Sequence, residues 1–160
     1  MKPTVRLLLS HPTHFIALGF GSGLSPKAPG TAGTLAAWLL YPLLHTLLDS
    51  WAMAAFLVAA FAFGIIACTR TGRALGVADH GAVVWDEIVA FWLVLWLTPP
   101  TLVWQALAFT LFRFFDIVKP PPIHWVDART RDGFGVMVDD LLAAGYALLV
   151  LALTVRLLGD

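Results

Sequence analysis

Long apolar runs with almost no charge constrain this chain more than any other feature of its sequence. Five runs of helical length cover residues 34–48, 51–69, 86–98, 101–118 and 139–158. Only 12% of the 160 residues are charged, whereas soluble domains carry roughly 25%. Because so little charge cannot cover a soluble surface, we expect lipid to be the solvent. The sequence predicts an all-α, polytopic helical membrane protein with about four to five apolar helices, built as one domain over residues 1–160.

The first residues resemble the start of a signal peptide but do not continue as one. Lys2 and Arg6 precede three leucines, and then His11 and Pro12 interrupt the apolar stretch. No small-residue cleavage site follows. We therefore expect residues 1–14 to form an N-terminal segment that stays on the protein, in the cytoplasm or at the membrane interface.

Pro99 and Pro100 allow two topologies, because they either kink one long span or turn the chain between two antiparallel helices. The turn gathers nine of the ten basic residues on one side of the membrane and leaves only Arg156 on the other. The kink would divide the basic residues between the two sides. Because positive charge concentrates in cytoplasmic loops, we favour the turn. It also places Trp85 at the cytoplasmic interface.

Acidic residues gather on the same side. A charged group at the bilayer centre costs about 2.5 to 3.5 kcal/mol on insertion scales, so carboxylates at helix ends must be solvated, paired or bound to metal. Solvation is the simplest explanation for any one of them, and those at helix starts can also be explained by capping or by the helix dipole. A cluster of carboxylates suits Mg²⁺, whereas zinc would require more Cys or His. The sequence predicts a Mg²⁺ site with candidate ligands Asp79, Asp86, Glu87, Asp116, Asp139 and Asp140.

A glycine-rich segment over residues 19–34 leads directly into the first apolar run. Its backbone N–H groups, the hydroxyls of Ser22 and Thr31, the ammonium of Lys27 and a helix start together suit a phosphate. The segment lacks the ending of a Walker motif, and Pro26 breaks the dinucleotide-binding pattern. A purely structural turn and a phosphate-binding loop both remain open.

Arg113, Asp116 and Lys119 follow at three-residue steps, which places them along one face of a helix. They form either a local ladder of ion pairs or a phosphate site. In the second case Arg113 and Lys119 bind phosphate oxygens, and Asp116 orients Arg113 or binds metal. His80 is a candidate general acid, although a histidine beside an aspartate is often only hydrogen-bonded.

Four segments, residues 19–33, 79–87, 113–123 and 133–140, resemble in order and spacing the motifs of the phosphatidylglycerophosphatase A family of bacterial inner-membrane lipid phosphatases. The resemblance implies Mg²⁺-dependent hydrolysis of phosphatidylglycerophosphate to phosphatidylglycerol and inorganic phosphate. It implies a multi-pass protein of the bacterial inner membrane, with a phospholipid substrate and an active site on the cytoplasmic face. On this basis the catalytic candidates are Asp86, Glu87, Asp139 and His80.

Two other functions use similar residues. An ion or proton transporter would couple transport to the same carboxylates, but it would place them near the middle of the membrane, where this chain has almost none. A head-group transferase would carry an Asp-Gly-x2-Ala-Arg pattern, which is absent. The formal net charge of zero gives no reason to expect a nucleic-acid partner. The sequence makes no prediction of the oligomeric state.

Overall fold

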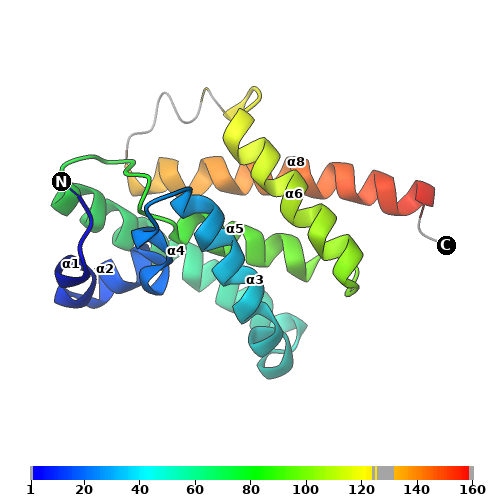
Figure 1. Cartoon of the computed structure of the whole chain (residues 1–160). Helices are drawn as coiled ribbons and strands as arrows, with labels where there is room; N and C mark the ends of the chain where they lie inside the picture. Colours follow the sequence, from blue (N-terminus) through cyan, green and yellow to red (C-terminus); the bar gives the residue numbers. More distant parts are fainter. Residues whose placement is uncertain (1, 124, 126–131, 159–160) are drawn as a thin grey trace.

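The computed structural model describes residues 2–123, 125 and 132–158, and within these residues every regular element is a helix. The predicted all-α fold is confirmed for this part of the chain. The elements are α1 (Val5–Ser10), α2 (Pro12–Ala17), the 3₁₀ helix η1 (Gly19–Leu24), α3 (Pro29–Leu47), α4 (Ser50–Leu75), α5 (Trp85–Trp96), α6 (Leu102–Val118) and α8 (Gly133–Leu158), as Figure 1 shows.

The chain turns at Pro99 and Pro100, as the distribution of basic residues predicted. α5 ends at Trp96 and α6 begins at Leu102, since the two prolines cannot continue the helix. Arg113, near the end of α6, lies 3.9 Å from Glu87 at the start of α5, measured from Nη1 to Oε1. The two helices are therefore antiparallel, and the single kinked span is excluded.

The motif-bearing ends of five helices meet at one end of the molecule, which we call the charged end. The backbone N–H of Gly133, at the start of α8, donates to Thr69 Oγ1 near the end of α4 at 3.0 Å. Gly30, at the start of α3, lies against Glu87 and Arg113. The charged end thus combines the starts of α3, α5 and α8 with the ends of α4 and α6.

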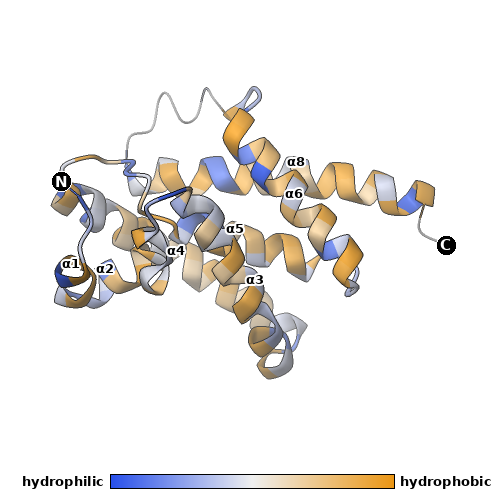
Figure 2. Ribbon diagram, in the orientation of Figure 1, coloured by the Kyte–Doolittle hydropathy of each residue, from blue (hydrophilic) through white to orange (hydrophobic). Residues whose placement is uncertain are grey.

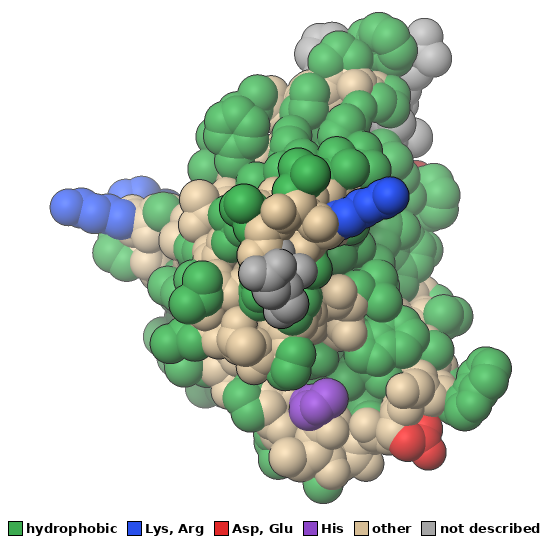
Figure 3. Space-filling model, turned by 90° about the vertical axis from the view of Figure 1, so that its right-hand side faces the viewer, with side chains coloured by type: hydrophobic (Ala, Val, Ile, Leu, Met, Phe, Trp, Pro, Cys, Tyr) green, Lys and Arg blue, Asp and Glu red, His purple; other side chains and the backbone are tan. Residues whose placement is uncertain are grey.

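The opposite end of the molecule carries little charge. Arg156, near the end of α8, lies there beside Pro99. This agrees with the prediction that Arg156 lies on the side opposite the other basic residues. Figure 3 views the molecule from the side on which α8 ends, and that face is mostly hydrophobic with few charged side chains. The asymmetry predicted from the sequence is therefore present in the described part of the fold.

Two of the described helices, α4 and α8, are long and apolar enough to cross a membrane. Each has 26 residues, or about 39 Å at 1.5 Å per residue. α5 has 12 residues, or about 18 Å, which is shorter than a roughly 30 Å hydrocarbon core. Large apolar side chains cover the outside of the molecule, including Leu39, Trp51 and Leu157, each at least 80% exposed; Figure 2 shows how apolar the long helices are. Such a surface is that of a membrane-associated protein.

α5 is the central helix, and nearly all of it is buried by α3, α4, α6 and α8. Two tryptophans fix it to its neighbours: Trp85 Nε1 donates to the carbonyl of Ala60 at 3.0 Å, and Trp92 Nε1 donates to the carbonyl of Ala37 at 2.9 Å. Trp85 lies at the charged end, where it was expected, but the residue is only 6% exposed, so it packs in the core and does not form part of an interfacial belt. A buried indole uses its N–H to satisfy a helix carbonyl while its ring fills the core.

The close approach of α8 to α4 generates a test of the packing. A Cβ at Gly133 would lie 2.2 Å from the carbonyl oxygen of Ile65, and backbone cannot move aside. Gly133→Ala should therefore lower the free energy of unfolding by about 1 to 3 kcal/mol, the usual cost of overpacking, measured by thermal unfolding in detergent.

The matched control is Gly145→Ala on the same helix, where a Cβ would meet nothing within 4 Å. This variant should be neutral or more stable by up to about 1 kcal/mol, since alanine is the better helix former. Equal melting temperatures for the two variants would contradict the packing of α8 against α4.

Candidate active site

Three carboxylates from two distant segments meet at the charged end. Asp86 and Glu87 lie in the first turn of α5, and Asp140 lies in the second turn of α8. One oxygen from each lies within 4.8 Å of the others. Asp86 and Asp140 are buried, and the side chain of Glu87 is 13% exposed. We call Asp86, Glu87 and Asp140 the carboxylate trio.

The trio has the chemistry of a cation site. One oxygen of each member, Asp86 Oδ1, Glu87 Oε2 and Asp140 Oδ2, is buried without a hydrogen-bond partner among the described residues. Burial first, and then the charge of Glu87, raises the pKa of Asp86, because crowded anions are costly away from water. A hard divalent cation accepts such oxygens as ligands and neutralises their charge. The trio therefore fits Mg²⁺.

Arg113 lies beside the trio and is held by three groups. Its Nη1 is 2.7 Å from Asp116 Oδ2 and 3.9 Å from Glu87 Oε1, and it donates to Thr34 Oγ1 at 3.4 Å. The predicted pair between Arg113 and Asp116 is present. Asp116 also interacts with Asp140, so it connects Arg113 to the trio. Arg113 Nε is buried without a partner among the residues that the structure describes.

The start of α3 is in direct contact with these charges. A Cβ at Gly30 would lie 2.4 Å from Glu87 Oε1 and 3.0 Å from Arg113 Nη2, so any larger residue there would displace these two side chains. Thr31 belongs to the same first turn, and exposed Lys27 precedes it. The free N–H groups of a helix start favour anions. The glycine-rich segment thus brings a helix start close to Glu87 of the trio.

Other predicted residues do not join the trio. Asp139 forms an ion pair with Lys119, because consecutive helical residues point about 100° apart and its short side chain faces α6 rather than α5. Asp79 is exposed in the loop before α5. His80 lies in that loop, and its Nδ1 accepts the backbone N–H of Ala82 at 3.1 Å. Ser22 donates to the carbonyl of Gly19 at 2.8 Å, within its own turn.

Two residues that sequence reasoning did not single out, Gly30 and Thr34, contribute to the site. Thr34 is fully buried, accepts from Arg113 and donates to the carbonyl of Gly30 at 2.9 Å. The sequence placed Thr34 at the end of a loop, whereas α3 already begins at Pro29. Proline at the first helical position was the available signal for that earlier start.

The buried charges generate a second test. Arg113→Met removes the cation shared by Glu87 and Asp116. All three side chains are partly buried, and leaving such a group without its partner costs about 1 to 3 kcal/mol. We expect a fall of that size in the free energy of unfolding, measured by thermal unfolding in detergent without divalent metal. Adding Asp116→Leu to Arg113→Met should restore part of the loss, since it removes one unpaired anion.

The control is Lys27→Met, which removes an exposed cation close by in sequence and should change stability by less than about 0.5 kcal/mol. A loss for Arg113→Met no larger than that of the control would contradict the assigned ion pairs.

Comparison with known proteins identifies the family. Residues 15–155 match the sequence profile of phosphatidylglycerophosphatase A. The phosphatidylglycerophosphatase A of Haemophilus influenzae is 46% identical over 151 residues, covering 93% of this chain and 92% of the relative. That of Escherichia coli is 43% identical over 144 residues, covering 86% and 80%. A putative phosphatidylinositol-3-phosphatase of Bacteroides thetaiotaomicron is 40% identical over 151 residues, covering 90% and 94%. No solved structure matches the chain. The chain belongs to the phosphatidylglycerophosphatase A family.

Proposed function

We propose that this protein is a Mg²⁺-dependent lipid phosphatase that hydrolyses phosphatidylglycerophosphate to phosphatidylglycerol and inorganic phosphate. The observation that carries the proposal is the buried carboxylate trio with Arg113 and the start of α3 beside it. Anionic ligands for a metal and cationic donors for a phosphate are the two parts that phosphoryl transfer requires. The name phosphatidylglycerophosphatase A, borne by the Haemophilus influenzae and Escherichia coli relatives, supports the same reaction.

The trio would hold the metal, and Asp116, which interacts with Asp140, is a further candidate ligand. When bound, Mg²⁺ neutralises negative charge on the phosphoryl oxygens. Among the carboxylates predicted as ligands, Asp139 and Asp79 lie outside the trio, and a role for either in metal binding stays a prediction.

The phosphate would be received by the guanidinium of Arg113 and the N–H groups at the start of α3. Asp116 fixes one Nη of Arg113, which leaves the other donors of the planar fork free to bind anionic oxygens. Lys27 and Thr31 are placed at the same helix start. Lys119 contacts Asp139, so its binding of phosphate would require that pair to open or to be shared.

Hydrolysis breaks the bond between phosphorus and the glycerol oxygen, and water supplies the new oxygen on phosphorus. The leaving oxygen needs a proton. His80 accepts a backbone N–H at Nδ1, so its neutral ring carries the proton on Nε2, the atom that would donate to the leaving group. The proposed general base for water is a carboxylate among Asp86, Glu87 and Asp139, the residues that the sequence selected.

We place the protein in the bacterial inner membrane as a multi-pass protein, with the charged end in the cytoplasm. The concentration of basic residues at that end supports this orientation. A phospholipid keeps its acyl chains in the bilayer and presents its phosphate at the interface, where the charged end would meet it. A transporter gains no support, since the carboxylates gather at one end of the helices and not along their middle.

The activity is tested with purified protein in detergent. Phosphate release from phosphatidylglycerophosphate should require Mg²⁺ and stop with EDTA. Asp86→Asn and Asp140→Asn should each lower kcat by at least about 100-fold while the circular dichroism spectrum stays helical, since removing one preorganised electrostatic group commonly costs that much. Turnover at the wild-type rate in either variant would remove that residue from the site.

The control is Asp49→Asn, which changes a carboxylate at the opposite end. Asp49 caps α4 through Ala52 N at 2.8 Å, and asparagine caps about as well, so activity should be unchanged. Phosphatidylinositol 3-phosphate is assayed in parallel because the Bacteroides relative bears that name. Turnover of this lipid without turnover of phosphatidylglycerophosphate would overturn the proposed substrate.

Orientation is tested by cysteine labelling in a Cys68→Ala background. Single cysteines replacing Ser50 and Pro100 should react with a membrane-impermeant reagent from the periplasm, and those replacing Ser25 and Ala78 only from the cytoplasm. Labelling of both pairs from one side would contradict the multi-pass arrangement.

A further inference from the structure

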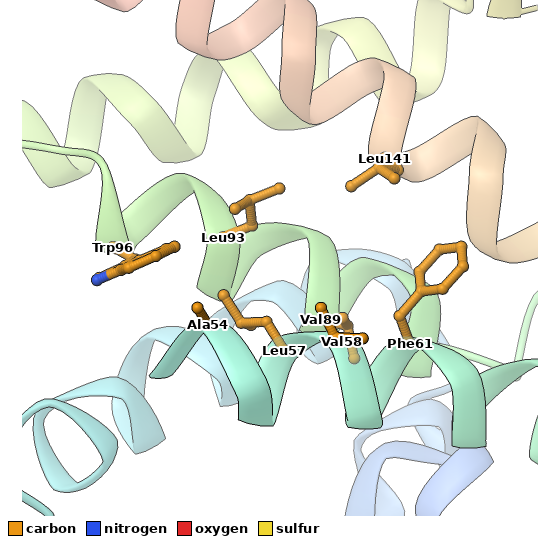
Figure 4. Close-up of a pocket in the computed structure, with 8 residues that line it drawn as sticks. All are labelled: Ala54, Leu57, Val58, Phe61, Val89, Leu93, Trp96 and Leu141. Carbon is orange, nitrogen blue, oxygen red and sulfur yellow. The ribbon is translucent and has the colours of Figure 1, made fainter. Parts of the chain in front are cut away.

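An apolar groove lies along the helices next to the carboxylate trio. Its volume is about 330 Å³, and it is open to the surface. Figure 4 shows side chains from α4, α5 and α8 around it. All of the lining side chains are aliphatic or aromatic. The principal ones are Ala54, Leu57 and Val58 of α4, Val89 and Leu93 of α5, and Leu141 of α8.

Two of the lining residues are close in the chain to the members of the trio. Leu141 directly follows Asp140 on α8, and Val89 lies one turn beyond Asp86 on α5. From Val89 the lining continues along α5 to Trp96, seven residues or about 10 Å further. The groove therefore begins beside the trio and runs away from the charged end, in the direction that the acyl chains of a lipid with its phosphate at the trio would follow.

We propose that this groove holds one acyl chain of the phospholipid whose phosphate binds at the trio. The inference rests on the proposed function and deepens it, because it assigns a place to the part of the substrate that does not react. The phosphate and the acyl chains belong to one molecule, so a lipid phosphate at the trio brings its chains with it. The groove starts at Leu141 and Val89, one and three residues beyond Asp140 and Asp86.

The groove is also open to the lipid from which such a chain would enter. Val58 is 70% exposed and Leu141 is 38% exposed, so a chain can slide in sideways without leaving the apolar phase. Because lipid is as apolar as the lining, entry gains little hydrophobic free energy. The expected contribution is orientation: a seated chain fixes the position of the phosphate relative to the trio, and small errors in position cost large factors in rate.

The test fills the groove at the part of α4 that is farthest from the trio. Ala54→Phe places a ring among the lining residues, whereas the matched control Ala55→Phe places the same ring on the exposed surface one residue away. For a dioleoyl phosphatidylglycerophosphate, Ala54→Phe should lower kcat/KM by about tenfold, and Ala55→Phe should leave it unchanged. For a dihexanoyl analogue, whose chains end before residue 54, both variants should match the wild type.

Melting temperatures show whether Ala54→Phe folds. Val58→Phe, at an exposed position of the same groove, serves as the second variant if it does not. The ratio of kcat/KM for the dioleoyl lipid to that for the dihexanoyl lipid is compared between the wild type and the groove variant that folds. An equal ratio would overturn the proposal while leaving the phosphatase function intact. A change in oligomeric state on size-exclusion chromatography, with no change in chain-length dependence, would instead identify the groove as a contact between copies of the chain and overturn the proposal.

A second measurement does not depend on turnover. Wild-type protein is photolysed with two lipids that carry the same diazirine-labelled acyl chain, a phosphatidic acid with a phosphate monoester and a phosphatidylcholine without one. Mass spectrometry should find α4 residues 54–61 labelled more by the phosphatidic acid, and Asp140→Asn should abolish this preference. Equal labelling by both lipids would mean that the groove takes bulk lipid only, which would overturn the proposal. Absence of phosphatase activity together with preferential labelling would overturn the proposed function but not the groove.

Discussion

The structure depends on how one partly buried cation, Arg113, is paired with the carboxylates around it. Its guanidinium contacts Asp116 on its own helix, Glu87 on α5 and Thr34 on α3. Three helices are thereby fixed relative to one another at the charged end. The contact with Glu87 needs α5 and α6 to be antiparallel, and glycine at position 30 leaves room for Glu87 and Arg113 against the start of α3. The ion pairs of Arg113 can therefore form only with this arrangement of α3, α5 and α6.

Arg113 does not neutralise all of the carboxylates around it. Asp86, Glu87, Asp116 and Asp140 outnumber it, and three of them carry a buried oxygen without a partner among the described residues. Buried anions of this kind are stable only when protonated or when a cation joins them. A fold that keeps such oxygens converging in a small volume gives up stability at that place, which is the usual signature of a site prepared for a ligand.

Several features of the fold and the site could be predicted from local sequence. Pro99 and Pro100 excluded a continuous helix, and the distribution of Lys and Arg selected the antiparallel turn. The pair between Arg113 and Asp116 followed from their three-residue spacing. The burial of Trp85 and the pairing of Asp139 with Lys119 were not foreseen, because both depend on which side chain of a neighbouring helix happens to face the residue. Two of the basic residues expected at the charged end, Arg129 and Arg131, lie outside the described residues.

The sequence by itself determined the helical class, the turn and the gathering of charge at one end, because these follow from hydropathy, proline stereochemistry and the cost of placing charge in lipid. Only the tertiary structure decided which carboxylates converge. Asp139 and Asp140 are adjacent in sequence and chemically identical, yet only Asp140 joins Asp86 and Glu87. The rotation of α8 about its axis makes that choice, and it is set by contacts such as Gly133 against α4, which no local pattern encodes.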